Sequence, residues 1–184
     1  MKSKILIIAA LGTTLGTALT TTAFAQENKP FSGLYGGVEA GVDWTKLAND
    51  LKRDRSLYYG GVIGYRQQMD NGTVFGLEGT FGDSGYNNNA LGLKSEYEWS
   101  TSVVLGQTFG DGGNLIYGKA GYAQATFNPV GTPNDSFNDG GWRFGGGYER
   151  ALSENVSVRL GGDYTTYGND NGQWQAKGGL LLKF

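Results

Sequence analysis

The last twelve residues of the chain, 173–184, alternate between an apolar and a largely polar set of side chains. Neighbouring side chains of a β-strand face opposite sides of the sheet, so this segment would have one apolar and one polar face. The apolar set begins and ends with an aromatic residue, Trp174 and Phe184, and the polar set carries Lys177 and Lys183. A soluble sheet can show this alternation. Aromatic residues about 10 positions apart at both ends of an apolar face fit a strand that crosses a membrane.

The same two-face pattern recurs along the whole chain. The sequence contains 33 Gly, 11 Tyr, 9 Phe and 4 Trp but only 3 Pro and no Cys. Glycine and aromatic residues spread over short alternating segments favour an all-β closed architecture. The pattern predicts eight strands, at about 33–44, 56–68, 73–82, 95–109, 115–127, 140–150, 156–167 and 173–184.

Short and long joints alternate between these segments. The joints after the second, fourth and sixth strands are short and carry turn residues, as in Asp70-Asn71-Gly72. The joints after the first, third and fifth strands are longer, at about 45–55, 83–94 and 128–139. Short turns at one end and longer loops at the other are typical of outer-membrane barrels. We therefore predict an eight-stranded antiparallel up-and-down transmembrane β-barrel, with both termini on the short-turn side, facing the periplasm.

One register of the predicted strands carries nearly every charged side chain. An Arg or Lys that faces lipid at mid-membrane costs about 2–4 kcal/mol, so this register is expected to face the lumen. Its acidic and basic residues are nearly balanced in number. The predicted lumen charge network consists of Glu39, Asp43, Arg66, Glu78, Glu96, Glu98, Lys119, Arg143, Glu149, Arg159, Asp163, Lys177 and Lys183.

This charge balance favours a plugged lumen over a pore. Eight strands enclose an interior that side chains can fill, and unpaired buried charges are costly, so mixed charges should pair there. An ion-conducting pore is the alternative. Inward glycines could leave small water pockets, or could simply permit the bending of a tightly curled sheet. The inward glycines of the pattern are Gly37, Gly41, Gly60, Gly64, Gly145, Gly147, Gly161 and Gly179.

Aromatic residues of the outward register fall at two heights. Two aromatic girdles are typical of a barrel that spans a membrane. A soluble barrel such as a lipocalin would instead place its charges outside and its apolar register within. The girdle residues are Trp44, Tyr59, Tyr97, Trp99, Trp142, Tyr164 and Trp174 toward the long loops, and Tyr65, Phe75, Phe109, Tyr148 and Phe184 toward the short turns.

The first 25 residues predict a secretory signal peptide, which leaves 26–184 as the barrel. Lys2 and Lys4 form a basic start, an apolar stretch follows, and Ala23-Phe24-Ala25 is a typical cleavage site. An N-terminal membrane anchor is disfavoured because the apolar stretch is short and broken by Gly and Thr. The net charge of −2 gives no basic excess that would indicate nucleic-acid binding.

These segments resemble the small outer-membrane β-barrel proteins of Gram-negative bacteria, the opacity-protein and porin-like group related to the membrane domain of outer-membrane protein A. The resemblance is carried by Phe31–Gly37, Val74–Gly79 and Gly140–Asn155. The final Leu182–Phe184 looks like the signal read by the barrel-assembly machinery, with Phe184 as its key residue. The resemblance implies the fold and an outer-membrane location, but no single activity. Members of the group include envelope-stabilising proteins, adhesins, immune-evasion proteins and minor pores.

The sequence offers little catalytic chemistry. It contains no His, the usual acid or base of the enzymes found among small outer-membrane barrels. Glu96 and Glu98 share a predicted face and could form an acid/base pair, but pairing with lumen bases is the favoured interpretation. The stretch 134–136 with Asp139 could touch Ca²⁺, although a solvated loop is the better explanation. We predict no enzyme activity, no cofactor and no metal site.

Function is therefore expected at the loops and in the envelope itself. The first long loop holds a candidate basic surface, which could bind lipopolysaccharide phosphates or an acidic host surface. We predict a structural and surface-interaction role in the outer membrane. A small-solute channel and an adhesin or lipopolysaccharide-binding protein are the alternatives. Expected partners are outer-membrane lipid, lipopolysaccharide, the assembly machinery and host ligands, and no nucleic acid. The candidate loop residues are Lys46, Lys52, Arg53 and Arg55.

Overall fold

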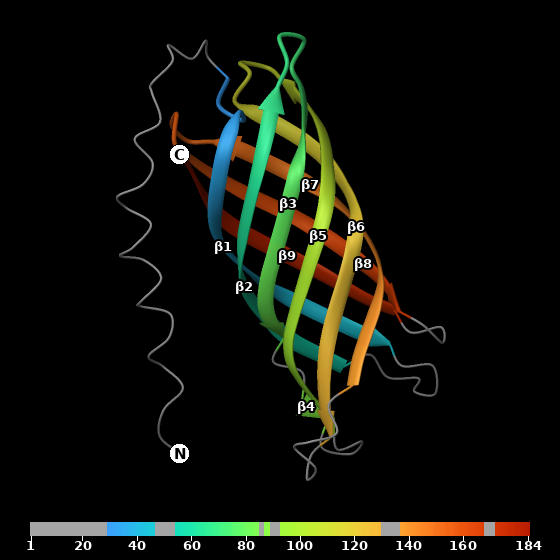
Figure 1. Ribbon diagram of the computed structural model, residues 1–184. Coiled ribbons are helices and arrows are strands. Elements are labelled where there is room, and N and C mark those ends of the chain that lie inside the picture. Colours follow the sequence, from blue (N-terminus) through green and yellow to red (C-terminus); the bar gives the residue numbers. More distant parts are fainter. Residues whose placement is uncertain (1–28, 47–53, 85–86, 89–92, 130–136, 168–171) are drawn as a thin grey trace.

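Eight long antiparallel strands close into a barrel, which confirms the predicted fold (Figure 1). The computed structural model describes residues 29–46, 54–84, 87–88, 93–129, 137–167 and 172–184. Neighbours in the chain pair with each other, β9 pairs with β1, and β3 pairs with β5, so the long strands leave no free edge. No helix long and apolar enough to cross a membrane occurs among the described residues. The long strands are β1 (Gly33–Lys46), β2 (Asp54–Gln68), β3 (Thr73–Ser84), β5 (Leu93–Phe109), β6 (Asn114–Pro129), β7 (Phe137–Ala151), β8 (Val156–Tyr167) and β9 (Gly172–Lys183).

The short turns lie together at one end of the barrel, here called the turn end; the opposite end is called the loop end (Figure 1). The predicted hairpin at Asp70-Asn71-Gly72 is confirmed. Gly72 has a φ of 81°, a conformation that glycine adopts without strain, and its N–H donates to the carbonyl of Met69 at 3.0 Å. The last residue lies at the same end, where the Phe184 N–H donates to the carbonyl of Leu34 at 2.9 Å.

Backbone pairing extends further toward the loop end than the sequence pattern indicated. β2 begins at Asp54 and β7 begins at Phe137, which shortens the predicted long loops. The predicted loop at 83–94 also contains a two-residue strand, β4 (Asn87–Asn88), which pairs with the start of β5. The prediction stopped early because it followed the apolar alternation, whereas backbone hydrogen bonds do not depend on the side chains.

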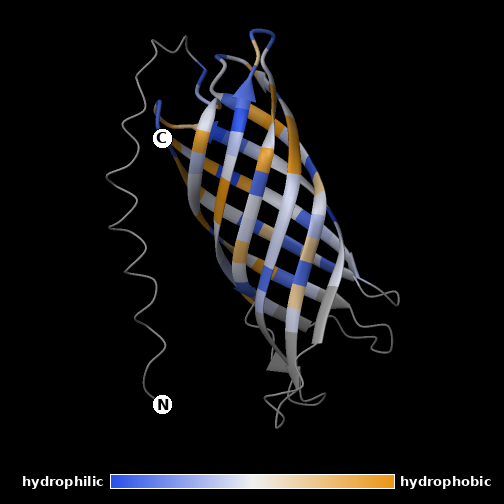
Figure 2. Ribbon diagram, in the orientation of Figure 1, coloured by the Kyte–Doolittle hydropathy of each residue, from blue (hydrophilic) through white to orange (hydrophobic). Residues whose placement is uncertain are grey.

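The two faces of the wall differ as the alternation predicted. Leu57 and Leu160 are 70% and 67% exposed on the outside, while their sequence neighbours Tyr58 and Arg159 are 2% and 3% exposed inside. Figure 2 shows hydrophobic and hydrophilic positions alternating along the strands. The outer surface is therefore apolar and the interior charged, the reverse of a soluble barrel.

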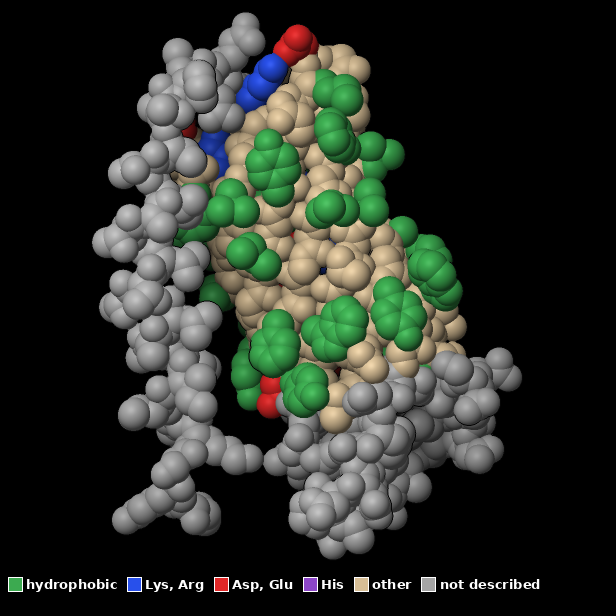
Figure 3. Space-filling view, viewed as in Figure 1, with side chains coloured by type: hydrophobic (Ala, Val, Ile, Leu, Met, Phe, Trp, Pro, Cys, Tyr) green, Lys and Arg blue, Asp and Glu red, His purple; other side chains and the backbone are tan. Residues whose placement is uncertain are grey.

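Outward aromatic residues contact one another across neighbouring strands. Toward the loop end, the rings of Tyr164 and Trp174 lie 4.7 Å apart, measured between centroids. Toward the turn end, the rings of Phe109 and Tyr148 lie 6.3 Å apart. Figure 3 shows apolar side chains covering this outer wall near both of its ends. The arrangement agrees with two aromatic girdles.

Candidate functional site: the barrel interior

The interior gathers the charged residues that the sequence pattern assigned to the lumen. Among them, every side chain that the structure describes is buried except Lys183, which is partly exposed at the turn end. Glu96 lies where the pairing of β5 with β6 shifts register, and its side chain is outside the described part of the chain. The buried charged residues, here called the lumen network, are Glu39, Asp43, Arg66, Glu78, Glu98, Lys119, Arg143, Glu149, Arg159, Asp163 and Lys177.

Nearest the turn end, Glu149 of β7 holds two arginines. Arg66 of β2 donates to it through both terminal nitrogens, at 2.8 and 3.0 Å. Arg159 donates through Nε at 3.1 Å and the Ser157 hydroxyl at 2.6 Å. The paired contacts from Arg66 are charge-assisted and have the fork geometry that binds a carboxylate strongly. They join β2 to β7, two strands that are not neighbours in the sheet.

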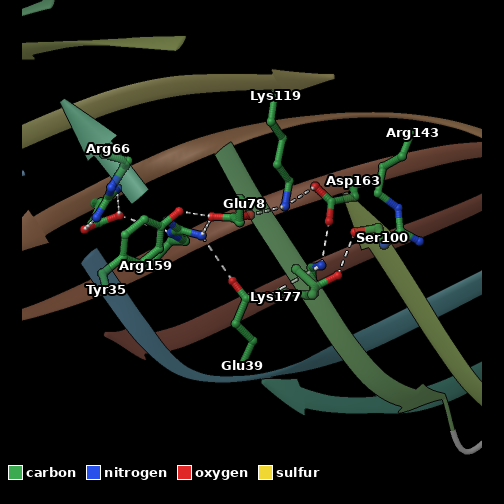
Figure 4. Close-up of polar contacts among 12 residues, drawn as sticks. Tyr35, Glu39, Arg66, Glu78, Ser100, Lys119, Arg143, Arg159, Asp163 and Lys177 are labelled. Carbon is green, nitrogen blue, oxygen red and sulfur yellow. Dashed lines mark hydrogen bonds and ion pairs between the residues drawn. The ribbon is translucent and has the colours of Figure 1, made fainter. Parts of the chain in front are cut away.

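In the middle of the lumen, Glu78 of β3 accepts three donors (Figure 4). Arg159 Nη1 lies 2.6 Å from one carboxylate oxygen, and the Tyr35 hydroxyl donates to the same oxygen at 2.7 Å. Lys119 Nζ donates to the other oxygen at 3.2 Å. Glu78 therefore ties together β1, β3, β6 and β8 from the inside of the barrel.

A third carboxylate, Asp163 of β8, holds the two lysines of the lumen network. Lys177 Nζ lies 2.5 Å from Asp163 Oδ2, and Lys119 Nζ lies 3.3 Å from Asp163 Oδ1. Glu39 also contacts two bases. Its Oε2 lies 3.6 Å from Lys177 Nζ, and its Oε1 lies 3.4 Å from Arg159 Nη1. Arg159 contacts Glu149 and Glu78 as well as Glu39, and Lys119 contacts both Glu78 and Asp163. These charges therefore form one connected system.

Toward the loop end, Arg143 of β7 is fully buried beside Glu98 of β5. Arg143 Nη2 donates to Glu98 at 2.7 Å, and its Nε donates to the Thr165 hydroxyl at 2.8 Å. The Gln175 amide donates to Glu98 at 3.4 Å. Glu98, one half of the acid/base pair considered above, is thus engaged by a guanidinium and an amide.

The inward glycines accommodate tyrosine rings. A Cβ placed on Gly64 would lie 2.5 Å from the ring of Tyr35, and one on Gly60 would lie 2.6 Å from the Tyr58 hydroxyl. A Cβ on Gly161 would lie 2.7 Å from the hydroxyl of Tyr117. Side chains therefore occupy the space above these three glycines, which argues against water pockets at these positions.

A cation lies over each of the three tyrosines. Arg66 sits 4.0 Å from the ring centroid of Tyr35, Lys177 lies 4.9 Å from that of Tyr58, and Arg159 lies 4.9 Å from that of Tyr117. Cation–π contacts add to ion pairing where the groups are removed from water. The inward tyrosines were not among the predicted site residues. The sequence could have indicated them, because each is an aromatic residue in the polar register that pairs with an inward glycine of a neighbouring strand.

A layer of apolar side chains lies in the interior at the turn end. Phe31 is 1% exposed and packs with four inward side chains. Its N–H donates to the Gln68 amide oxygen at 3.2 Å, and the Gln68 N–H donates to the Ser32 hydroxyl at 2.8 Å. The sequence pattern missed this role, because Phe31 lies before β1 and belongs to no strand. The apolar layer consists of Phe31, Val74, Val104, Leu115 and Tyr117.

The other predicted site residues belong to the first long loop and to the end of the chain. Lys46 and Arg55 belong to the loop-end tips of β1 and β2, and their side chains are outside the described set. Lys52 and Arg53 lie outside the described residues altogether. Phe184 is 63% exposed on the outer wall. The described residues therefore do not show where the candidate basic loop lies relative to the lumen network.

The described residues contain no group of three or more His, Cys, Asp or Glu side chains that could hold a metal ion. Inside the barrel, Glu78 and Glu149 are each engaged by bases and a hydroxyl, and Glu98 and Asp163 by bases. The arrangement suits mutual neutralisation of charge and cross-bracing of the wall.

Fold and interior together define a membrane-spanning β-barrel with an apolar outer wall and an interlocked charged interior. The chain belongs to the family described as the outer membrane protein beta-barrel domain, whose pattern matches residues 11–184. It is therefore an outer-membrane protein.

Two curated relatives are outer-membrane proteins of Gram-negative bacteria. The 22 kDa outer membrane protein of Rhizobium leguminosarum bv. viciae is 30% identical over 140 residues, which cover 74% of this chain and 66% of that protein. The 25 kDa outer-membrane immunogenic protein of Brucella abortus is 29% identical over 194 residues, which cover 93% of this chain and 87% of that protein.

The fold also matches a solved barrel. The crystal structure of Ail, the attachment invasion locus protein of Yersinia pestis, in complex with the heparin analogue sucrose octasulfate, aligns with a TM-score of 0.56. The match covers 83% of this chain and 99% of Ail at 16% sequence identity. At this identity the likeness shows a shared fold.

Proposed function

We propose that this outer-membrane barrel is a closed envelope protein with a structural role in its wall and a surface-interaction role at its loops. The observation that carries the proposal is the lumen network, in which Glu78, Glu149 and Asp163 each hold two bases inside the barrel. An ion crossing the lumen would have to displace paired charges and then the apolar layer. Both steps are unfavourable, which supports a structural interior over a channel or an enzyme.

Conductance in planar bilayers tests this proposal. We expect the purified protein to insert without producing steady single-channel currents. The decisive variant is Gly179→Leu, which adds bulk beside Glu39 inside the lumen. Gly178→Leu, on the outer face of the same strand, is the matched control. Steady currents in the native protein that vanish in Gly179→Leu and persist in Gly178→Leu would establish the small-solute channel instead.

The proposal places the turn end and both termini in the periplasm, with the loops outside the cell. Short turns on the periplasmic side are usual in such barrels. Residues 1–25 would be removed on export. Mass spectrometry of the protein isolated from outer membranes should give a chain that begins at Gln26. Protease added to intact cells should cut only in the long loops; cleavage at the short turns would reverse the orientation.

The basic first loop is the proposed contact surface. Lys46, Lys52, Arg53 and Arg55 would bind phosphate or sulfate groups of an acidic sugar polymer by charge. Replacing these four residues with Ser should weaken binding to lipopolysaccharide or to host cells, and the weakening should disappear at high salt. A heparin-type polymer is a useful probe, because Ail was crystallised with a heparin analogue. An unchanged binding curve would reject the loop as the contact surface.

Assembly is proposed to depend on the exposed Phe184. Deleting this residue should lower the amount of barrel in the outer membrane more than it lowers the stability of protein refolded in vitro. The shortened chain keeps the lumen network intact. Normal outer-membrane levels of the shortened chain would exclude an assembly signal at this residue.

A further inference from the structure

A groove runs along the outer wall of the barrel, here called the wall groove. It crosses β9, β1, β2 and β3 and has a volume of about 1210 Å³. A Cβ added to Gly61 or Gly79 would have no atom nearer than 3.7 Å, so open space lies above both residues. Exposed apolar side chains flank these two glycines, which makes the groove suitable for a hydrocarbon chain. The apolar part of the wall groove includes Val38, Gly61, Ile63, Gly79, Phe81 and Leu180.

The loop end of the wall groove carries a negative charge among aromatic rings. Asp83 of β3 lies there on the outer face, and the Tyr59 hydroxyl donates to its Oδ2 at 3.1 Å. The rings of Phe81 and Tyr97 stack beside them, with centroids 6.0 Å apart. A carboxylate next to aromatic rings suits an ammonium group, which is attracted both by the charge and by the ring faces. A carboxylate on a lipid-facing wall is also costly unless a cation neutralises it.

The position of the bases favours lipid over a second copy of the chain as the source of that cation. The bases whose side chains the structure describes are either buried in the lumen network or lie at the turn end, as Lys29, Arg150 and Lys183 do. A second copy beside the groove, in the same membrane orientation, would therefore bring none of these bases to Asp83. Lipid surrounds the outer wall and can carry an ammonium group in its headgroup.

We propose that the wall groove is a selective binding site for a membrane lipid whose headgroup carries an ammonium group. One acyl chain would lie over Gly61 and Gly79, and the ammonium group would lie between Asp83 and the rings of Tyr59 and Tyr97. A lipid with the same chains and an anionic headgroup would fill the groove but would be repelled by Asp83. The site uses neither the lumen network nor the basic first loop, so it is independent of the proposed function.

Native mass spectrometry of the folded barrel, released from detergent after mixing with lipid, tests the selectivity. The probes are phosphatidylcholine and phosphatidylglycerol with identical acyl chains, so that only the headgroup differs. We expect one tightly bound phosphatidylcholine per barrel and at least fivefold weaker binding of phosphatidylglycerol. Equal binding of the two lipids would overturn the proposal. A dimer that excludes lipid would also overturn it, because the groove would then be a contact between two copies of the chain.

Filling the groove tests where the lipid lies. Gly61→Leu places a side chain in the open space of the groove and should weaken phosphatidylcholine binding at least tenfold. Gly118→Leu is the matched control, because Gly118 lies on β6 outside the groove and a Cβ there also has no atom nearer than 3.8 Å. Gly79→Leu is a second filling variant, and circular dichroism identifies the variants that fold. Equal binding by a folded filling variant and by the control would overturn the site.

Removing the charge tests the headgroup contact separately. Asp83→Asn keeps the shape of the groove and should reduce the preference for phosphatidylcholine over phosphatidylglycerol to less than twofold. Asp111→Asn, at an exposed turn away from the groove, should leave the preference unchanged. An unchanged preference in Asp83→Asn would exclude this carboxylate as the selective group and overturn the proposal.

Discussion

The apolar layer and the lumen network lie inside the same barrel, yet they are held together differently. The apolar layer is stabilised mainly by close packing around Phe31, whose ring has no charge of its own to neutralise. The lumen network is stabilised by mutual neutralisation, and Glu78 alone satisfies two bases and a phenol. Removing one member therefore leaves a cavity in the first region and uncompensated charges in the second.

The largest effect is expected in the lumen network. Glu78→Leu removes the carboxylate that lies 3.2 Å from Lys119 and 2.6 Å from Arg159. Because these two buried bases then lose a partner, the variant should lower the free energy of unfolding by about 4 kcal/mol. Glu154→Gln, at an exposed turn, is the control and should change it little. Urea unfolding in lipid vesicles, followed by tryptophan fluorescence, measures both. A loss equal to that of the control would mean that the lumen charges do not brace the wall.

The apolar layer should respond to volume. Phe31→Ala removes a fully buried ring and should cost about 3 kcal/mol. Phe31→Leu keeps most of the volume and should cost less than about 1.5 kcal/mol. The same urea titration compares the two variants. Equal losses would show that the ring makes a specific contact, such as the one with Arg66 at 5.7 Å, which packing alone does not explain.

Two glycines of β2 allow an inward position to be compared with an outward one. Gly64→Ala would place a methyl group 2.5 Å from the Tyr35 ring, and the resulting overpacking should cost about 2 kcal/mol. Gly61→Ala adds the same methyl group on the outside, where the nearest atom lies 3.7 Å away. Gly61→Ala should therefore be nearly neutral. If the two variants lost stability equally, the cost would arise from the strand backbone and not from the ring.

The smallest effect is expected at the turn end, where charges meet water. The Gly113 N–H and the Arg150 guanidinium hold the pKa of Asp111 below its ordinary value. A carboxyl whose pKa is lowered in the folded state contributes stability at pH values above the ordinary pKa of the unfolded chain. This contribution disappears as the pH falls through the lowered pKa. Asp111→Asn should remove that part of the pH dependence and change little else. Unfolding curves of both proteins between pH 7 and acid pH should converge at the acid end.

Much of this architecture could be predicted from alternation alone. The number of strands, the three short turns and the orientation of the two faces all follow from which side chains recur at every second position. Charges of the lumen network such as Arg143 and Glu149 were predicted to lie inside, because lipid excludes them. The ends of the strands were less predictable, since β4 and the extended starts of β2 and β7 depend on backbone pairing.

The partners inside the lumen were beyond the reach of the sequence. Arg66 and Glu149 are separated by 83 residues, and they meet only because β2 and β7 face each other across a closed barrel. Phe31 carries no alternation signal, so its place in the apolar layer could not be read from periodicity. The Arg66–Glu149 contact and the position of Phe31 both depend on the closure of the barrel and on how far along the barrel axis each residue lies.

The sequence by itself determined a barrel with an apolar outside and a charged inside, because a two-residue period assigns each side chain to one face of a strand. Only the tertiary structure decided which charges pair, which tyrosine covers which glycine, and where the interior turns from polar to apolar. Those features depend on distances across the lumen, and such distances exist only after β3 meets β5 and β9 meets β1.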